Sequence, residues 1–259
     1  MIKKLGVQIF TVRDYLQTED DVKRSFEKLY NIGYREIQTA GLYDFTTPEK
    51  FAQTAKDSGL EIIGTHVPMP EIESNIDKLI EMHKIYGTTN MGIGSMPGLF
   101  AGQATPEFVE EFVERFNKCA KKASEHGIKL TYHNHHYEFL KHNGKFIMDT
   151  LIDGFDKENI SFVLDTYWLQ AGGVSIIEYM NKCAGRVDIL HLKDYMVRLK
   201  EECIYTEVLN GNINFASVVD TAEKIGVKHY VVEQDFCPGD PFESLKISHD
   251  NLKRAGLLA

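Results

Sequence analysis

The fold of this chain is decided by a pattern that is clearest at Lys224-Ile225-Gly226-Val227, which leads into an apolar run at residues 230–233. A glycine directly after an amphipathic stretch is typical of a helix end, and the short apolar run after it is typical of a buried strand. The same joint recurs at Asn31-Ile32-Gly33-Tyr34, Asp57-Ser58-Gly59-Leu60 and Glu125-His126-Gly127-Ile128. The chain therefore repeats a helix-to-strand unit.

Eight apolar runs predict eight strands, with starts mostly about 25 to 40 residues apart, the length of one strand, one helix and two loops. These predicted strands are residues 5–9, 36–39, 62–67, 90–94, 129–133, 162–165, 189–193 and 230–233. Amphipathic stretches lie between them. Residues 20–30 place Val22, Phe26, Leu29 and Tyr30 on one helical face, and residues 106–123 place Phe108, Phe112, Phe116 and Cys119 at helical spacing.

Eight such units in 259 residues match an α/β chain folded as a single (β/α)8 TIM barrel. The competing architecture is an open doubly wound sheet, which would usually carry a GxGxxG motif or a P-loop after its first strand. Neither motif is present, and no Pro/Ser-rich linker divides the sequence. We therefore expect one TIM-barrel domain over residues 1–259.

Composition and charge exclude several classes of protein. Lys and Arg total 29 against 38 Asp and Glu, so the net charge of −9 disfavours a general nucleic-acid-binding surface. No apolar run has the length of a membrane span, and the N-terminus lacks the pattern of a signal peptide. The four cysteines, Cys119, Cys183, Cys203 and Cys237, form no CxxC pair. A cytoplasmic protein without membrane or nucleic-acid partners is expected.

Ionisable residues stand at the ends of five of the eight predicted strands. Strand ends meet at one rim of a barrel, and side chains alternate inward and outward along each strand. This alternation predicts a lower ring of His133, Asp165, His191 and Glu233, and a second ring of His135, Lys193 and Asp235. Imidazole and carboxylate donors in this mixture suit Mn²⁺, Zn²⁺, Co²⁺ or Fe²⁺. The alternative to a ligand role for any single histidine is that of a hydrogen-bonded residue at the rim. The alternative to a catalytic role for Lys193 is that of an ion-pair partner of a carboxylate.

The order and spacing of several short motifs resemble the xylose isomerase-like TIM-barrel superfamily, in its sugar phosphate isomerase/epimerase branch, over essentially the whole chain. The matching segments are residues 6–14, 33–37, 65–66, 132–135, 138–139, 164–168, 172–173, 191–194, 211–214 and 232–235. Members of this superfamily hold a divalent metal with Glu, Asp, His and Glu from strands five to eight. By position, the resemblance implies His133, Asp165, His191 and Glu233 as the metal ligands here.

Strand five departs from the family pattern, because His133 stands where the superfamily has Glu. The 3-epimerases of this superfamily use that Glu together with the strand-eight Glu as two bases on opposite faces of the substrate. The sequence Tyr132-His133-Asn134-His135 is more similar to 2-keto-myo-inositol dehydratases and keto-glycoside lyases. The resemblance therefore implies an isomerase/epimerase or a lyase that removes a proton α to a carbonyl of a sugar, keto-sugar or inositol derivative. Among these activities, β-elimination of the dehydratase type is the alternative to isomerisation or epimerisation.

In this chemistry the metal acts as a Lewis acid, Glu233 is the candidate base, and Lys193 or His135 would protonate the product or the leaving oxygen. The candidate substrate contacts are Gln8, Arg13, His66, Asn134 and Trp168. For Arg13, a purely structural role is an equal alternative to substrate binding. For Trp168, the alternative is packing at the barrel rim. The resemblance also implies a small carbohydrate as the partner and a homodimer or homotetramer as the assembly.

Two other classes of function are weighed against this one. An endonuclease of the abasic-site type shares the barrel, but it needs about three metals and a basic DNA face, against which the charge of −9 argues. A non-catalytic sugar-binding barrel is the second class. The four ligand-type residues argue against it, while the histidine at position 133 keeps it open.

Overall fold

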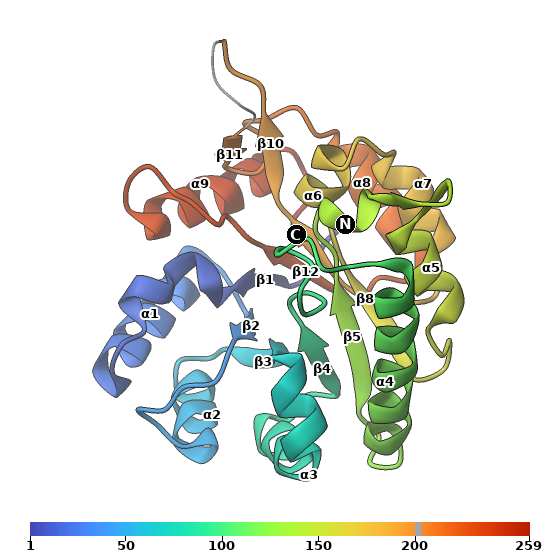
Figure 1. The fold of residues 1–259 in the computed structure, drawn as a ribbon. Coiled ribbons are helices and arrows are strands. Elements are labelled where there is room, and N and C mark those ends of the chain that lie inside the picture. The colour runs from blue at the N-terminus through green and yellow to red at the C-terminus, as the bar shows by residue number, and fades with distance from the viewer. Residues whose placement is uncertain (200–203) are drawn as a thin grey trace.

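Eight parallel strands close into a barrel in the computed structural model, which describes residues 1–199 and 204–259 (Figure 1). The strands follow one another around the barrel in the order β1-β12-β9-β8-β5-β4-β3-β2. Their bounds are β1 Leu5–Gln8, β2 Glu36–Ala40, β3 Glu61–His66, β4 Asn90–Ile93, β5 Lys129–His133, β8 Ile160–Asp165, β9 Val187–Leu192 and β12 His229–Val232. Each coincides with a predicted strand to within a few residues, so the predicted (β/α)8 architecture is confirmed.

Helices connect the strands and surround the barrel (Figure 1). They are α1 Glu19–Ile32, α2 Pro48–Asp57, α3 Met69–Tyr86, α4 Pro106–Ser124, α5 Ile147–Gly154, α6 Thr166–Ala171, α7 Ile176–Lys182, α8 Phe215–Ile225 and α9 Pro241–Arg254. Two 3₁₀ helices, Ile9–Tyr15 and Tyr137–Phe139, follow β1 and β5. Among the described residues, no helix has the length and hydropathy that a membrane span needs.

The helix ends are set by local chemistry that the sequence displays. At the start of α1, the Thr18 hydroxyl accepts from the backbone N–H of Asp21 at 3.1 Å, which satisfies one of the free donors of the first turn. The four glycines predicted at helix ends have positive φ angles of 129° (Gly33), 78° (Gly59), 73° (Gly127) and 82° (Gly226). A side chain at these positions would be strained, so the glycines end the helices as predicted.

The predicted helix faces are largely the buried ones. Helix α1 buries Val22, Phe26 and Leu29, but Tyr30 is 40% exposed, so the prediction for Tyr30 is wrong. The reason is that its ring lies at the edge of the helix, with the Arg35 guanidinium 4.1 Å from the ring centroid. On α4, Phe112 and Phe116 are buried as expected, whereas Phe108 and Cys119 are partly buried against the core.

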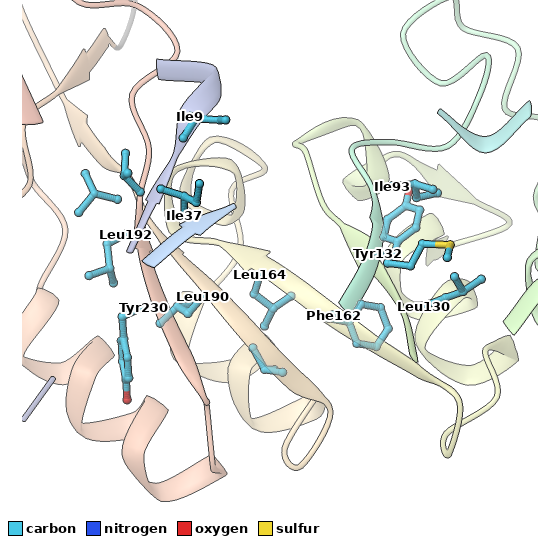
Figure 2. Close-up of a cluster of buried hydrophobic side chains, with 14 of the residues drawn as sticks. Ile9, Ile37, Ile93, Leu130, Tyr132, Phe162, Leu164, Leu190, Leu192 and Tyr230 are labelled. Carbon is cyan, nitrogen blue, oxygen red and sulfur yellow. The ribbon is translucent and has the colours of Figure 1, made fainter. Parts of the chain in front are cut away.

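The alternation of side chains along the strands divides the apolar interior into two parts. Outward-facing residues such as Leu130, Phe162 and Leu190 belong to the large core beneath the helices (Figure 2). Ile63, Val163, Ile189 and Val231 form a separate buried cluster that comes from four barrel strands. This second cluster forms an apolar floor inside the barrel.

Two small antiparallel hairpins extend the basic pattern. One pairs β6 Lys141–His142 with β7 Lys145–Phe146, and the other pairs β10 Asp194–Met196 with β11 Ile204–Thr206. The β10–β11 hairpin projects beyond the barrel rim (Figure 1). Of the four cysteines, Cys119, Cys183 and Cys237 are free thiols, and Cys203 lies outside the described residues.

A matched pair of glycines on and after β4 tests how tightly the barrel interior is packed. A Cβ added at Gly92 would collide with the Thr65 carbonyl oxygen and lie 2.7 Å from Thr131 Oγ1, whereas one added at Gly94 would be 3.7 Å from its nearest neighbour. We expect Gly92→Ala to lower the free energy of unfolding by about 1–3 kcal/mol, measured by urea denaturation. Gly94→Ala is the control and should change it by less than about 0.5 kcal/mol. Equal effects of the two substitutions would contradict this picture of the packing.

Candidate active site

Four ligand-type side chains converge at the carboxyl ends of neighbouring barrel strands. His133 ends β5, Asp165 ends β8, His191 lies near the end of β9, and Glu233 directly follows β12. One imidazole nitrogen or carboxylate oxygen from each of the four lies within 4.8 Å of the others. The floor residues Val163, Ile189 and Val231 stand two positions earlier on their strands, so the four polar side chains lie one layer above the apolar cluster.

The side chains of this group contact one another and are buried from solvent. Asp165 Oδ2 lies 3.4 Å from His133 Nε2 and 3.5 Å from His191 Nδ1, and Glu233 Oε2 lies 3.1 Å from the same Nδ1. All four side chains are at most 6% exposed. Burial alone would raise the pKa of Glu233, but Lys193 and His191 beside it hold that pKa well below its usual range. Burial lowers the pKa of His191, while Glu233 and Asp165 outweigh burial and raise it to about 9.

The donor set fits a divalent cation. Two imidazole nitrogens and two ionised carboxylates are the ligands that Mn²⁺, Zn²⁺, Co²⁺ and Fe²⁺ accept in proteins. Two buried carboxylates this close to each other also need nearby positive charge, which a bound cation would supply. His133, Asp165, His191 and Glu233 could therefore hold the metal, as the sequence predicts, and their role as ligands remains a prediction.

Lys193 lies in the second ring that the strand alternation predicts. Its Nζ is 2.7 Å from Asp235 Oδ1, 3.2 Å from Glu233 Oε2 and 3.6 Å from Asp165 Oδ2, and the side chain is 1% exposed. Burial favours loss of the proton, but the three carboxylates outweigh burial and raise the pKa of Lys193 above its usual value. The side chain is therefore a buried ammonium group at the edge of the ligand cluster.

Aromatic rings enclose this ammonium group. Its Nζ lies 4.8 Å from the ring centroid of Trp168 and 5.3 Å from that of Tyr205. Trp168 comes from α6, directly after Asp165, and Tyr205 comes from the β10–β11 hairpin. Ring faces attract a cation, so the aromatic groups add to the stabilisation of the Lys193 charge by the carboxylates.

His135 lies next to the ligand cluster, with its ring centroid 4.7 Å from that of His133 and 5.0 Å from that of Trp168. Burial lowers the pKa of His135 to about 2, helped by the neighbouring His133 and Lys193, so this imidazole is neutral. Its Nδ1 has no hydrogen-bond partner among residues 1–199 and 204–259. The buried Glu138 carboxylate holds the segment in place, because it accepts from the His135 backbone N–H at 2.9 Å and from the Tyr132 hydroxyl at 2.8 Å.

The predicted substrate contacts have different surroundings. The His66 ring lies 5.2 Å from His133, and Gln8 Nε2 lies 3.5 Å from His66 Nδ1, so both lie beside the cluster. Asn134 Oδ1 accepts from the backbone N–H of Asp165 at 3.0 Å, which ties β5 to β8. Arg13 donates to the carbonyl oxygens of Phe10 and Asp235 at 2.9 and 3.1 Å. Asn134 and Arg13 thus have structural contacts, and substrate binding by all these residues remains a prediction.

Sequence reasoning missed residues that act through distant contacts. Gln38, on β2, bonds to both His66 and His191, although no ionisable residue marks the end of that strand. Tyr205 lies on a hairpin outside the eight repeated units. Asp194 accepts four backbone N–H groups, from Tyr195, Leu209, Gly211 and Ile213 at 2.7 to 3.2 Å, and so fixes the base of that hairpin. The motif at residues 191–194 contains Asp194 and could have indicated that this residue belongs to the site.

Comparison with known proteins supports a family assignment. The model of a family described as Xylose isomerase-like TIM barrel matches residues 26–255. An inosose dehydratase of Geobacillus thermodenitrificans is 26% identical over 159 residues, which are 53% of this chain and 53% of that protein. The chain therefore spans about half the length of the first curated relatives that it matches. An inosose dehydratase of Clostridium beijerinckii is 23% identical over 235 residues, covering 84% of this chain and 76% of that protein.

Solved structures share the fold. A sugar phosphate isomerase/epimerase from Parabacteroides distasonis superposes with a TM-score of 0.83 at 22% identity, covering 100% of this chain and 96% of the other. An L-ribulose 3-epimerase superposes with a TM-score of 0.75 at 16% identity, covering 99% and 95%. At these identities the likeness concerns the barrel.

The buried Glu138 predicts a pH dependence of stability. Burial raises the pKa of Glu138 to about 6, against hydrogen bonds from Tyr132 and His135 that lower it. Between about pH 4.5 and 6 the folded state therefore holds more protons than the unfolded state, so this residue destabilises the fold as pH rises, by about 2 kcal/mol in total. We expect Glu138→Gln to remove this slope, measured as the difference in unfolding free energy from wild type at several pH values.

The control is Glu110→Gln, at an exposed position on α4. Its difference from wild type should stay flat over the same interval. A flat difference for Glu138→Gln as well would show that the Glu138 carboxyl titrates normally.

Proposed function

This chain belongs to the xylose isomerase-like TIM barrel family, and from that premise we propose that it is a divalent-metal-dependent lyase that dehydrates a keto-sugar or a keto-inositol. The observation that carries the proposal is the buried cluster of His133, Asp165, His191 and Glu233, with the Lys193 ammonium 3.2 Å from Glu233. The matches to inosose dehydratases support the same class of reaction.

The ligand cluster supports metal dependence. His133, Asp165, His191 and Glu233 would hold the cation, with Mn²⁺, Zn²⁺, Co²⁺ or Fe²⁺ as the candidates. When bound there, a divalent cation supplies Lewis acidity that polarises a substrate carbonyl and so acidifies the adjacent C–H group. The apolar floor beneath the cluster keeps water from that side and strengthens every charge interaction in the site.

The chain's own residues suit the two proton transfers of a β-elimination. Glu233 is an ionised carboxylate and takes the proton from the carbon next to the carbonyl. Lys193 is the group that carries a proton to give, since His135 is neutral. The electron pair of the broken C–H bond forms a carbon–carbon double bond, the hydroxyl on the next carbon departs, and a proton from Lys193 completes it as water.

The remaining residues bind and orient the substrate in this proposal. His66 and Gln8 lie beside the ligand cluster on the side of β1 and β3. Trp168 presents a ring on which the apolar face of a sugar can pack, and His135 next to it has a free ring nitrogen for a substrate hydroxyl. Asn134 and Arg13 would act mainly by holding the strands and loops that carry these groups.

The choice of elimination over epimerisation depends on residue 133. Epimerisation needs a second base on the opposite face of the substrate. His133 Nε2 faces Asp165 within the ligand cluster, and the nearby His135 imidazole is a weak base because burial lowers its pKa to about 2. Neither residue replaces a second carboxylate.

Membership of the family also supports a small carbohydrate as the partner, a homodimer or homotetramer as the assembly, and a cytoplasmic location.

Metal content is the first test. We expect purified wild type to hold close to stoichiometric Mn, Zn, Co or Fe by elemental analysis after dialysis against each ion. Asp165→Asn and His191→Ala should lose it, because the first removes the negative charge of one ligand and the second removes an imidazole ligand from the cluster. Thermal unfolding serves as the control for folding of the variants. Wild type that takes up no metal at all would sink the metal-dependent mechanism and favour a non-catalytic sugar-binding barrel.

The second test is dehydration of inosose by the metal-loaded protein, followed by the ultraviolet absorbance of the unsaturated product. Lys193→Met should lower kcat by about 100- to 10,000-fold, because the departing hydroxyl loses its proton donor. The matched control is Lys224→Met, at an exposed position paired with Asp220, which should leave kcat unchanged. Exchange of the α-proton with D₂O without loss of water would instead indicate an isomerase or epimerase.

A further inference from the structure

Each of the two histidines in the ligand cluster points one ring nitrogen at the carboxylates and the other at a neutral acceptor. His133 Nε2 faces Asp165, while its Nδ1 lies 3.0 Å from the carbonyl oxygen of Gly94. His191 Nδ1 faces Glu233 and Asp165, while its Nε2 lies 2.6 Å from Gln38 Oε1. The two rings therefore use opposite nitrogens for the cluster.

The acceptors decide which nitrogen carries the proton. A carbonyl oxygen can only accept a hydrogen bond, so Nε2 of His191 must be the N–H that donates to Gln38. A cation bound at Nδ1 would replace the proton that the Glu233 and Asp165 carboxylates favour on that nitrogen, and Nε2 would keep its proton toward Gln38. The backbone carbonyl of Gly94 has the same effect on His133, with the proton on Nδ1 and the lone pair on Nε2.

The Gln38 amide lies between two histidine rings. It is 0% exposed, with Oε1 toward His191 Nε2 and its own Nε2 3.0 Å from His66 Nε2. The other ring nitrogen of His66 lies 3.5 Å from the Gln8 amide nitrogen, so the tautomer of His66 can match either orientation of the Gln38 amide. A cation on Nδ1 of His191 would set that orientation, because Nε2 would then carry the proton and only the amide oxygen of Gln38 can accept it.

We propose that Gln38 is a positioning residue that fixes His191 as the Nε2–H tautomer and so presents Nδ1 as the metal-ligating atom. This inference rests on the proposed function, because it concerns the cation that the four clustered residues would hold. Groups that accept from the second nitrogen of a ligating histidine fix its ring orientation, and their loss typically weakens metal binding by about 10- to 100-fold. Gln38 is the side chain through which this can be tested, because the acceptor of His133 is a backbone carbonyl.

The test measures affinity for Zn²⁺ alone, without substrate, by calorimetry on metal-free full-length protein. Gln38→Met keeps the length of the side chain and removes the acceptor, so we expect its Kd to rise by about 10- to 100-fold. Gln38→Glu keeps an acceptor for His191 and should bind Zn²⁺ at least as tightly as wild type. Recovery by Glu but not by Met separates an acceptor role from simple packing.

A matched control comes from Gln234, another buried glutamine, whose Nε2 donates to the Phe236 carbonyl oxygen. Gln234→Met changes a buried amide one residue from Glu233 without touching the bond to His191, and it should leave the Kd unchanged. Urea denaturation of each variant checks that all of them are folded.

A spectroscopic measurement reads the tautomer directly. In cadmium-loaded protein with isotope-labelled histidine, long-range proton–nitrogen NMR should show the metal on Nδ1 of His191 and the proton on Nε2. The same spectrum should show the opposite arrangement for His133.

The outcomes separate this inference from the proposed function. Metal on Nε2 of His191, or an unchanged Kd in Gln38→Met, would overturn the role of Gln38 while leaving the metal site intact. Wild type that binds neither Zn²⁺ nor Cd²⁺ would overturn the proposed function and this inference together. Weaker binding in Gln38→Met, recovery in Gln38→Glu and metal on Nδ1 would together establish the role.

Discussion

Closure of the parallel barrel is the constraint on which the rest of this structure depends. A closed ring of strands in which side chains alternate leaves room inside for a few stacked layers, so residues two positions apart lie directly above one another. Val163, Ile189 and Val231 fill one layer, and Asp165, His191 and Glu233 fill the next. The alternation of side chains alone therefore places the charged cluster directly above the apolar cluster inside the barrel.

The charged layer is costly to the fold. Asp165, Glu233 and Asp235 are carboxylates beside one buried ammonium group, Lys193, and burying such charges seldom stabilises a protein. The compensation comes from two kinds of contact with Lys193, those of the three carboxylates and those of the Trp168 and Tyr205 rings. Removing any single charge would leave an uncompensated partner, so these side chains act as one electrostatic unit.

Sequence reasoning succeeded where a local pattern carries the information. The eight strands, the glycines at helix ends and the convergence of His133, Asp165, His191 and Glu233 all follow from short-range periodicity combined with barrel geometry. It failed for Gln38, because an amide inside a strand looks like any polar residue until its partner 153 positions away is known. Tyr205 was missed for a related reason, since the hairpin that carries it interrupts the repeat that guided the prediction. Tyr30 was misplaced because helical spacing alone does not reveal the edge of a buried face.

The two halves of the chain contribute different parts of the site. All four ligand-type residues come from β5, β8, β9 and β12, whereas both acceptors of their histidines, Gln38 and the Gly94 carbonyl, belong to the segment before β5. A recombination junction in the gene between β4 and β5 would transfer all four ligand-type residues together, but would replace Gln38 by another protein's residue. The Gln38 side chain is therefore a contribution of the first half of the chain to a cluster whose four members all lie in the second half.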